Sequence, residues 1–159
     1  MHKRILLSVA VQRFLELTPQ ALGARDIALT LAKAYGAKVF VLTILSRLVA
    51  PVEGADTTEE KLKKLVEPLL AAKLDVETVI MDGIPAKVIL EVAEEKQADL
   101  IIIGAHTKKA PLDFSLGGVA ASVLKNTPVR VILVGPSKEE ARKSRDLLIP
   151  EYPEIFPYV

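Results

Sequence analysis

Two glycine positions flank one polar segment of this chain, and residues of these types at a helix start can bind a phosphate. Gly104 ends the apolar run 100–103 and is followed by His106 and Thr107, and Gly117-Gly118 opens a short helical pattern. Glycine amides at a helix N-terminus attract anions, because they are unshielded and the helix dipole is positive there. The segment therefore has groups that would suit a phosphate.

Each of these features also has a purely structural interpretation. Gly117-Gly118 either forms an anion-binding nest or only lets the loop turn into the helix, and both interpretations stay open. His106 has no serine or carboxylate partner nearby in the sequence, which favours an ordinary loop histidine over a general base. Lys108 and Lys109 could add positive charge, but adjacent lysines on a polar loop are typically solvated.

Composition excludes several classes of function. The chain has no cysteine, so disulfides, thiolate catalysis and cysteine-ligated metals are excluded. Its 21 basic and 20 acidic residues give no field toward nucleic acid or membranes. Asp82, Asp99 and Asp113 are scattered without metal-ligand spacing. Common P-loop, dinucleotide, serine-hydrolase and zinc patterns are missing, so we expect no metal and no enzyme activity. The apolar run after Arg4 is too short for a signal peptide or a membrane span, so we expect a cytoplasmic location.

Strands and helices must alternate to position the glycines. Apolar runs predict five buried strands, at residues 4–11, 38–45, 75–81, 100–103 and 129–134. Helix starts are predicted at Thr18-Pro19, at Thr57 with Glu60, at Gly83-Ile84-Pro85, at Gly117-Gly118 and at Ser137 with Glu140. Alternation on 159 residues predicts one doubly wound α/β domain with a parallel sheet. Ligands of such sheets bind beyond the carboxyl ends of the strands, here at Ala10-Val11 and Gly104.

The helix faces and the end of the chain carry further expectations. The stripe of the first helix includes Ala28 and Tyr35, and the charged run from Lys61 to Lys64 is expected in solvent. We divide the chain into a domain over residues 1–136 and a helix with an extended aromatic tail over 137–159. That tail docks either on the protein's own dimer, which we favour, or in a partner's groove.

Three segments carry a family resemblance: Gly83-Ile84-Pro85, Ala98 to Gly104 (ADLIIIG) and Pro128 to Val134 (PVRVILV). With the order of elements, they make the chain similar to the universal stress proteins from Arg4 to Val134. The resemblance implies strand order 3-2-1-4-5, the adenine-nucleotide alpha-hydrolase-like fold, and a homodimer formed through the fifth strand (Val129 to Val134).

The resemblance also implies a nucleotide site, and the chain departs from it at three positions. Nucleotide-binding members carry glycine, two residues, glycine, nine residues, then glycine and a serine or threonine. Here Thr107 replaces the second glycine, Gly118 replaces the hydroxyl residue, and Ala10 replaces an aspartate that contacts the nucleoside. The implied cofactor-binding residues are Gly104, His106, Thr107, Gly117, Gly118, Val119, Ala10 and Ile44.

These departures favour a regulatory stress-response module over a nucleotide enzyme. We expect a homodimer with an unidentified protein partner, no catalytic residues and no tightly bound cofactor. The alternative is a member that still binds ATP and acts as a nucleotide-dependent switch. A third class, an enzyme of adenylyl transfer, would need clustered catalytic groups that the sequence lacks.

Overall fold

The computed structural model describes residues 3–104 and 118–150, which contain alternating strands and helices. Their order is β1 (Arg4–Ser8), α1 (Pro19–Tyr35), β2 (Lys38–Leu45), α2 (Thr58–Ala71), β3 (Val76–Asp82), α3 (Pro85–Glu95), β4 (Leu100–Gly104), α4 (Gly118–Asn126), β5 (Arg130–Val134) and α5 (Lys138–Leu147). The strands form one parallel sheet in the order β3-β2-β1-β4-β5. The predicted doubly wound α/β sheet and its strand order are therefore confirmed.

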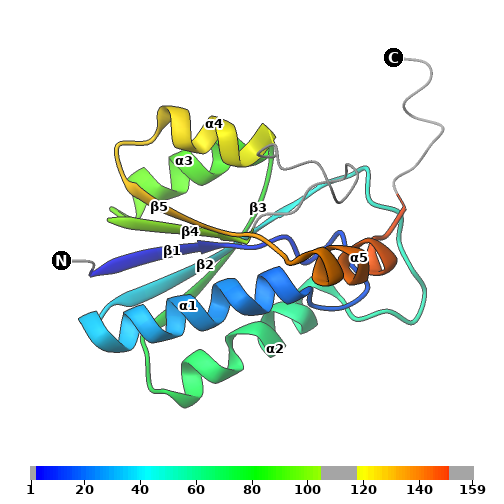
Figure 1. Ribbon diagram of the computed structural model, residues 1–159, viewed down its shortest axis with the longest axis horizontal. Helices are drawn as coiled ribbons and strands as arrows, with labels where there is room; N and C mark the ends of the chain where they lie inside the picture. The colour runs from blue at the N-terminus through cyan, green and yellow to red at the C-terminus, as the bar shows by residue number, and fades with distance from the viewer. Residues whose placement is uncertain (1–2, 105–117, 151–159) are drawn as a thin grey trace.

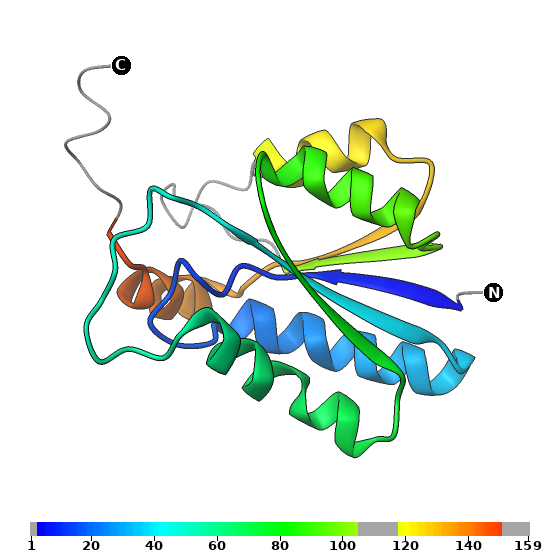
Figure 2. The same cartoon turned by 180° about the vertical axis from the view of Figure 1, so that it is seen from behind.

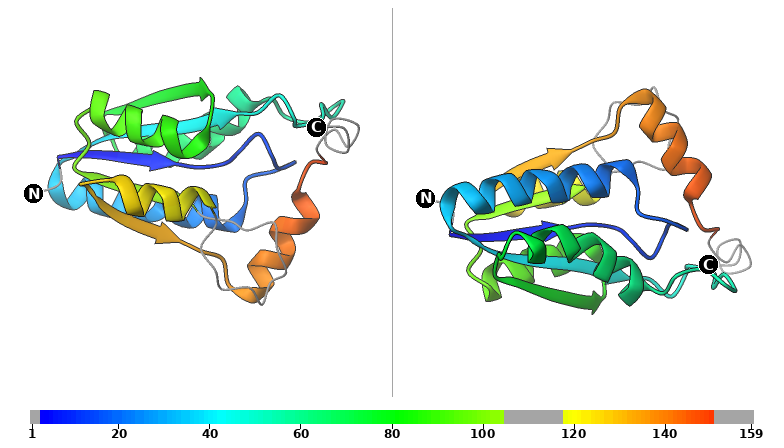
Figure 3. Two further views of the ribbon diagram at one scale, coloured as in Figure 1. Left: turned by 90° about the horizontal axis from the view of Figure 1, so that it is seen from above. Right: turned by 90° about the horizontal axis from the view of Figure 1, so that it is seen from below.

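The helices form two layers that enclose the sheet. α1 and α2 cover one face and α3 and α4 cover the other (Figures 1 and 2). α5 lies beyond the carboxyl end of β5, beside the start of α1 (Figure 3). Among the described residues, no helix is both long and apolar enough to cross a membrane.

The first strand is shorter than the predicted run of residues 4–11. β1 ends at Ser8, because its pairing with β4 stops at the Ser8–Ile103 pair. The amide of Val9 still donates to the carbonyl of Leu42 at 3.0 Å, so the chain stays beside β2 for one more residue. Residues 9–17, named here the β1–α1 loop, then lead across the carboxyl edge of the sheet.

The predicted helix starts have the expected side-chain caps. Thr18 Oγ1 accepts a hydrogen bond from the amide of Ala21 at 3.2 Å, with Pro19 as the first helical residue. Capping boxes are formed by Thr57 with Glu60 and by Ser137 with Glu140. Each box satisfies helix amides that have no partner inside the helix, which fixes the start of α2 and α5.

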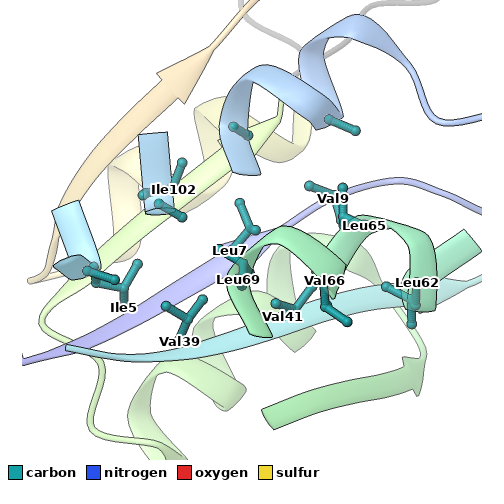
Figure 4. Packing of buried hydrophobic residues seen from close by; sticks show 14 of the residues in the cluster. Ile5, Leu7, Val9, Val39, Val41, Leu62, Leu65, Val66, Leu69 and Ile102 are labelled. Atoms are coloured by element: carbon teal, nitrogen blue, oxygen red, sulfur yellow. The ribbon is translucent and has the colours of Figure 1, made fainter. Parts of the chain in front are cut away.

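The core on the α1 and α2 side is built from small residues on one helix and branched residues on the strands (Figure 4). Ala24, Ala28 and Ala32 of α1 are fully buried, which lets the helix approach the sheet closely. Tyr35 was expected on this buried stripe, but 36% of it is exposed. It is the last residue of α1 and lies at the margin of the covered face.

Candidate functional site

The candidate site lies where β1 and β4 end side by side. The chain leaves β1 toward α1 on one face of the sheet and leaves β4 toward α4 on the other (Figures 1 and 3). Because Ser8 pairs with Ile103, Val9 and Gly104 follow at the same level. The topology therefore brings Ala10 and Gly104, 94 positions apart in the sequence, to one edge. Such a switch point is where doubly wound folds bind ligands.

Gly104 has a packing role at this edge. A Cβ atom there would lie 3.3 Å from the carbonyl oxygen of Gln20 and 3.5 Å from side-chain carbons of Ala24 and Val9. The missing side chain thus lets the first turn of α1 approach β4. This contact explains the glycine without any ligand.

Gly118 has no comparable steric reason. It is exposed at the first position of α4, and a Cβ atom there would meet no atom within 4 Å. Val119, which follows it, is 37% exposed. Within the part of the chain that the structure describes, no atom therefore crowds the start of α4. The predicted residues His106, Thr107 and Gly117, together with Lys108, Lys109 and Asp113, lie outside the described residues.

The remaining predicted positions, Ala10 and Ile44, are half-buried at the same carboxyl edge. Ile44 pairs with Met81 of β3, and Met81 is 40% exposed. Ile84, just before α3, is 69% exposed. An apolar surface thus borders the site on the side of β2 and β3, while Ala10 supplies no polar side-chain atom.

Gln12 joins the two loops that border the site, which the sequence reasoning did not anticipate. Its Nε2 donates to the carbonyl of Ser46 at 3.2 Å, and its Oε1 accepts from the amide of Ser46 at 2.7 Å. Ser46 begins the segment 46–56, named here the β2–α2 loop. One side chain therefore links the β1–α1 and β2–α2 loops as a paired strand would.

Lys61 was expected in solvent with its charged neighbours, and this prediction is wrong. The residue is 3% exposed, and its Nζ donates to the carbonyls of Val11 at 2.9 Å and Phe14 at 2.7 Å. Its position explains the burial, since it precedes Leu65 by four residues and therefore lies on the same helix face. That spacing was the available signal. Lys63 and Lys64 are exposed as expected.

Burial changes the proton affinity of Lys61. Loss of solvent lowers the pKa of its ammonium group, and the charge of Asp56 opposes this shift. Asp56 itself forms a short hydrogen-bonded ion pair with the exposed Lys64. The cation beneath the β1–α1 loop is therefore stabilised chiefly by backbone carbonyls, so it serves to hold the loop.

The described residues contain no metal site. No group of three or more histidine, aspartate or glutamate side chains in residues 3–104 and 118–150 is arranged to hold an ion. Asp99 lies at the opposite edge of the sheet, where its carboxylate accepts from the amides of Lys3 at 2.9 Å and Arg4 at 3.4 Å. Asp99 thus anchors the start of β1.

Comparison with known proteins identifies the family. The model of the universal stress protein family matches residues 1–135. The chain belongs to the universal stress protein family. Universal stress protein MJ0531 of Methanocaldococcus jannaschii is 32% identical over 132 residues, which cover 76% of this chain and 78% of that protein.

Solved universal stress proteins have the same fold. One in complex with cAMP matches with a TM-score of 0.61 and 24% identity, over 86% of this chain and 98% of that one. The Archaeoglobus fulgidus protein in complex with dAMP matches with a TM-score of 0.57 and 21% identity, over 82% and 97%. At these identities the likeness establishes the α/β fold alone.

Proposed function

We propose that this universal stress protein is a non-enzymatic regulatory module of a cytoplasmic stress response, that it acts as a homodimer, and that its site does not hold ATP tightly. The proposal depends on the presence of an alanine at position 10. Ala10 lies at the switch point, where the family resemblance calls for an aspartate that contacts the nucleoside. An uncharged methyl group there removes one charge-assisted hydrogen bond.

The surroundings of Ala10 support this proposal, because the backbone beside it is fixed. Lys61 holds the carbonyl of Val11, and Gln12 is bound to Ser46. A hydrogen bond to a charged group contributes about 1.5–3 kcal/mol. Its loss corresponds to about a 10- to 100-fold weaker complex, since about 1.4 kcal/mol is a factor of ten in affinity.

A second candidate function is binding of an adenine nucleotide as a switch. Two structural neighbours were solved with cAMP and dAMP. In this chain the open start of α4 at Gly118 offers amides to a phosphate, and exposed Met81 and Ile84 offer an apolar surface to a base. A nucleotide held by these groups alone would bind weakly.

Two measurements on one preparation of purified protein distinguish the module without tight ATP binding from the nucleotide switch. The purified protein is denatured, any released nucleotide is identified by mass spectrometry, and the emptied protein is titrated with ATP by calorimetry. The proposal predicts no stoichiometric nucleotide and no binding in the micromolar range, which corresponds to about −8 kcal/mol. Stoichiometric ATP, or micromolar binding, would replace the proposal by the nucleotide switch.

The homodimer is proposed through β5. This strand is at the end of the sheet, and its residues Val131, Ile132 and Leu133 are half-buried. An apolar edge strand needs cover, and a second copy can supply it. Sedimentation equilibrium checks the assembly, and a monomer at all concentrations together with turnover of a substrate would contradict the proposed function.

A further inference from the structure

The chain continues past the family domain with a helix that crosses the carboxyl side of the molecule. The family match ends at residue 135, and α5 follows from Lys138 to Leu147. In Figure 3 this helix runs from the end of β5 toward the ends of β1 and β2. Its Ser144 is 4% exposed, and Ser144 Oγ donates to Oε1 of the buried Gln20 in α1 at 2.7 Å. α5 is therefore docked against the start of α1.

The residues after α5 pair with the β1–α1 loop as an added strand. Phe14 and Leu148 form an antiparallel bridge. On either side of it, the amide of Leu15 donates to the carbonyl of Leu147 at 2.8 Å, and the amide of Ile149 donates to the carbonyl of Arg13 at 2.7 Å. The pairing is thus made by backbone groups in strand geometry.

The same residues also reach the β2–α2 loop. The amide of Ala50 donates to the carbonyl of Pro150 at 3.1 Å. Ile149 is 6% exposed and Phe14 is 2% exposed, so apolar burial accompanies these hydrogen bonds. We name residues 137–150 the strap, because they join both loops that border the candidate site.

The β1–α1 loop is consequently held from three elements. Lys61 of α2 binds the carbonyls of Val11 and Phe14, Ser46 binds the side chain of Gln12, and the strap binds residues 13–15. Ala10 lies directly before this stretch. The contacts that hold the β1–α1 loop therefore also restrain the backbone at Ala10, which borders the candidate site.

We propose that the strap is a positioning element of the carboxyl-edge site. Its docking holds the β1–α1 loop directly, and it holds the β2–α2 loop both through Gln12 and through the hydrogen bond between Ala50 and Pro150, in the conformation that builds the site. The proposal concerns the site named under Proposed function, and its docking step is tested without any ligand. Release of the strap would remove one of the three anchors of the β1–α1 loop and one anchor of the β2–α2 loop, which makes it a means of regulating the site.

The amide of Ser46 is the reporter, because it donates to Oε1 of Gln12, which directly precedes the residues 13–15 that the strap binds. Hydrogen exchange at this amide is compared between the natural chain and Ile149→Pro, which removes the amide bound to Arg13. We expect exchange at Ser46 to rise by about tenfold through local opening. Arg142→Ala, on the exposed side of α5, is the matched control with no change expected.

A reversible lock tests the same proposal while keeping the buried side chains of Phe14 and Ile149. The chain has no cysteine, so Leu15→Cys with Leu147→Cys gives one defined pair. The amide of Leu15 donates to the carbonyl of Leu147 one position from the Phe14–Leu148 bridge. Residues that oppose one another in antiparallel pairing have Cα atoms about 4.5–5.5 Å apart, within the range of a disulfide. We expect slower exchange at Ser46 in the oxidised form than in the reduced form, and each single cysteine variant should not respond to oxidation.

Two readouts separate this proposal from the proposed function. Equal exchange at Ser46 in the natural chain, Ile149→Pro and both redox forms would overturn the positioning role of the strap. ATP titration of the same proteins reports on the site itself. Absence of heat in every variant would leave the exchange result, and hence the strap, unaffected.

Discussion

Lys61 of α2 donates a hydrogen bond of 2.9 Å to the carbonyl of Val11, which lies 50 residues earlier in the chain. A second bond from the same ammonium group reaches the carbonyl of Phe14. A buried lysine therefore replaces the solvent that an irregular loop normally needs for its carbonyl groups. The ammonium group of Lys61 therefore holds the β1–α1 loop, which borders the candidate site.

Replacing Lys61 by methionine should destabilise the protein. The variant keeps most of the apolar stem but removes the ammonium donor that Lys61 supplies to the carbonyls of Val11 and Phe14. We expect the free energy of unfolding to fall by about 1–3 kcal/mol, because two buried hydrogen bonds to a charged group are lost. Urea unfolding measures it. Lys64→Met, which removes only an exposed ion pair with Asp56, is the control and should change stability by less than about 1 kcal/mol.

The lowered pKa of Lys61 predicts a pH dependence of stability. Because burial depresses the folded pKa of Lys61 below the ordinary lysine value of 10.5, the unfolded chain binds more protons between these two pKa values. The free energy of unfolding contributed by Lys61 therefore rises with pH across that alkaline window and is lowest at neutral pH.

The comparison of the natural chain with Lys61→Met isolates this contribution, since all other groups titrate alike in both proteins. Their difference in free energy of unfolding should grow from neutral pH toward the upper end of the window, in urea titrations at several pH values. A difference that shrinks as pH rises would mean that the ammonium group gains more from its carbonyl partners than it loses to burial.

The sequence predicted the fold well because its signals are local. Caps such as Thr18, the Thr57 box and the Ser137 box each lie within four residues of the amides they bind, and apolar runs mark the strands. The strand order came from the family resemblance. The partners around the site could not be predicted in this way: Gln12 binds Ser46, 34 positions away, and Ser144 binds Gln20, 124 positions away.

The two glycines of the candidate site should respond oppositely to alanine. At Gly104 the new Cβ would lie 3.3 Å from the backbone oxygen of Gln20, so α1 must shift. We expect a loss of about 1–3 kcal/mol, as for other overpacked sites. At Gly118 the new Cβ meets no described atom within 4 Å. Alanine should raise the free energy of unfolding by about 0.4–1 kcal/mol, because it lowers the conformational entropy of the unfolded chain. Thermal unfolding of both variants checks the pair, and equal losses would show that Gly118 also has a steric role.

Restoring a carboxylate at position 10 should strengthen nucleotide binding. Ala10 is half-buried at the carboxyl edge, beside a backbone fixed by Lys61 and Gln12, so an aspartate side chain there would be held in place. We expect Ala10→Asp to bind ATP about tenfold more tightly than the natural chain. A charge-assisted hydrogen bond contributes about 1.5–3 kcal/mol, and repulsion between the new carboxylate and the phosphates offsets part of that gain. Calorimetric titration measures the affinity.

Ala10→Asn is the matched control, because its side chain has nearly the same shape as aspartate without the charge. It separates the effect of the carboxylate from the effect of the added volume. If the aspartate and asparagine variants bind ATP equally, the lost charge at position 10 does not explain weak binding, and Thr107 and Gly118 become the positions to restore.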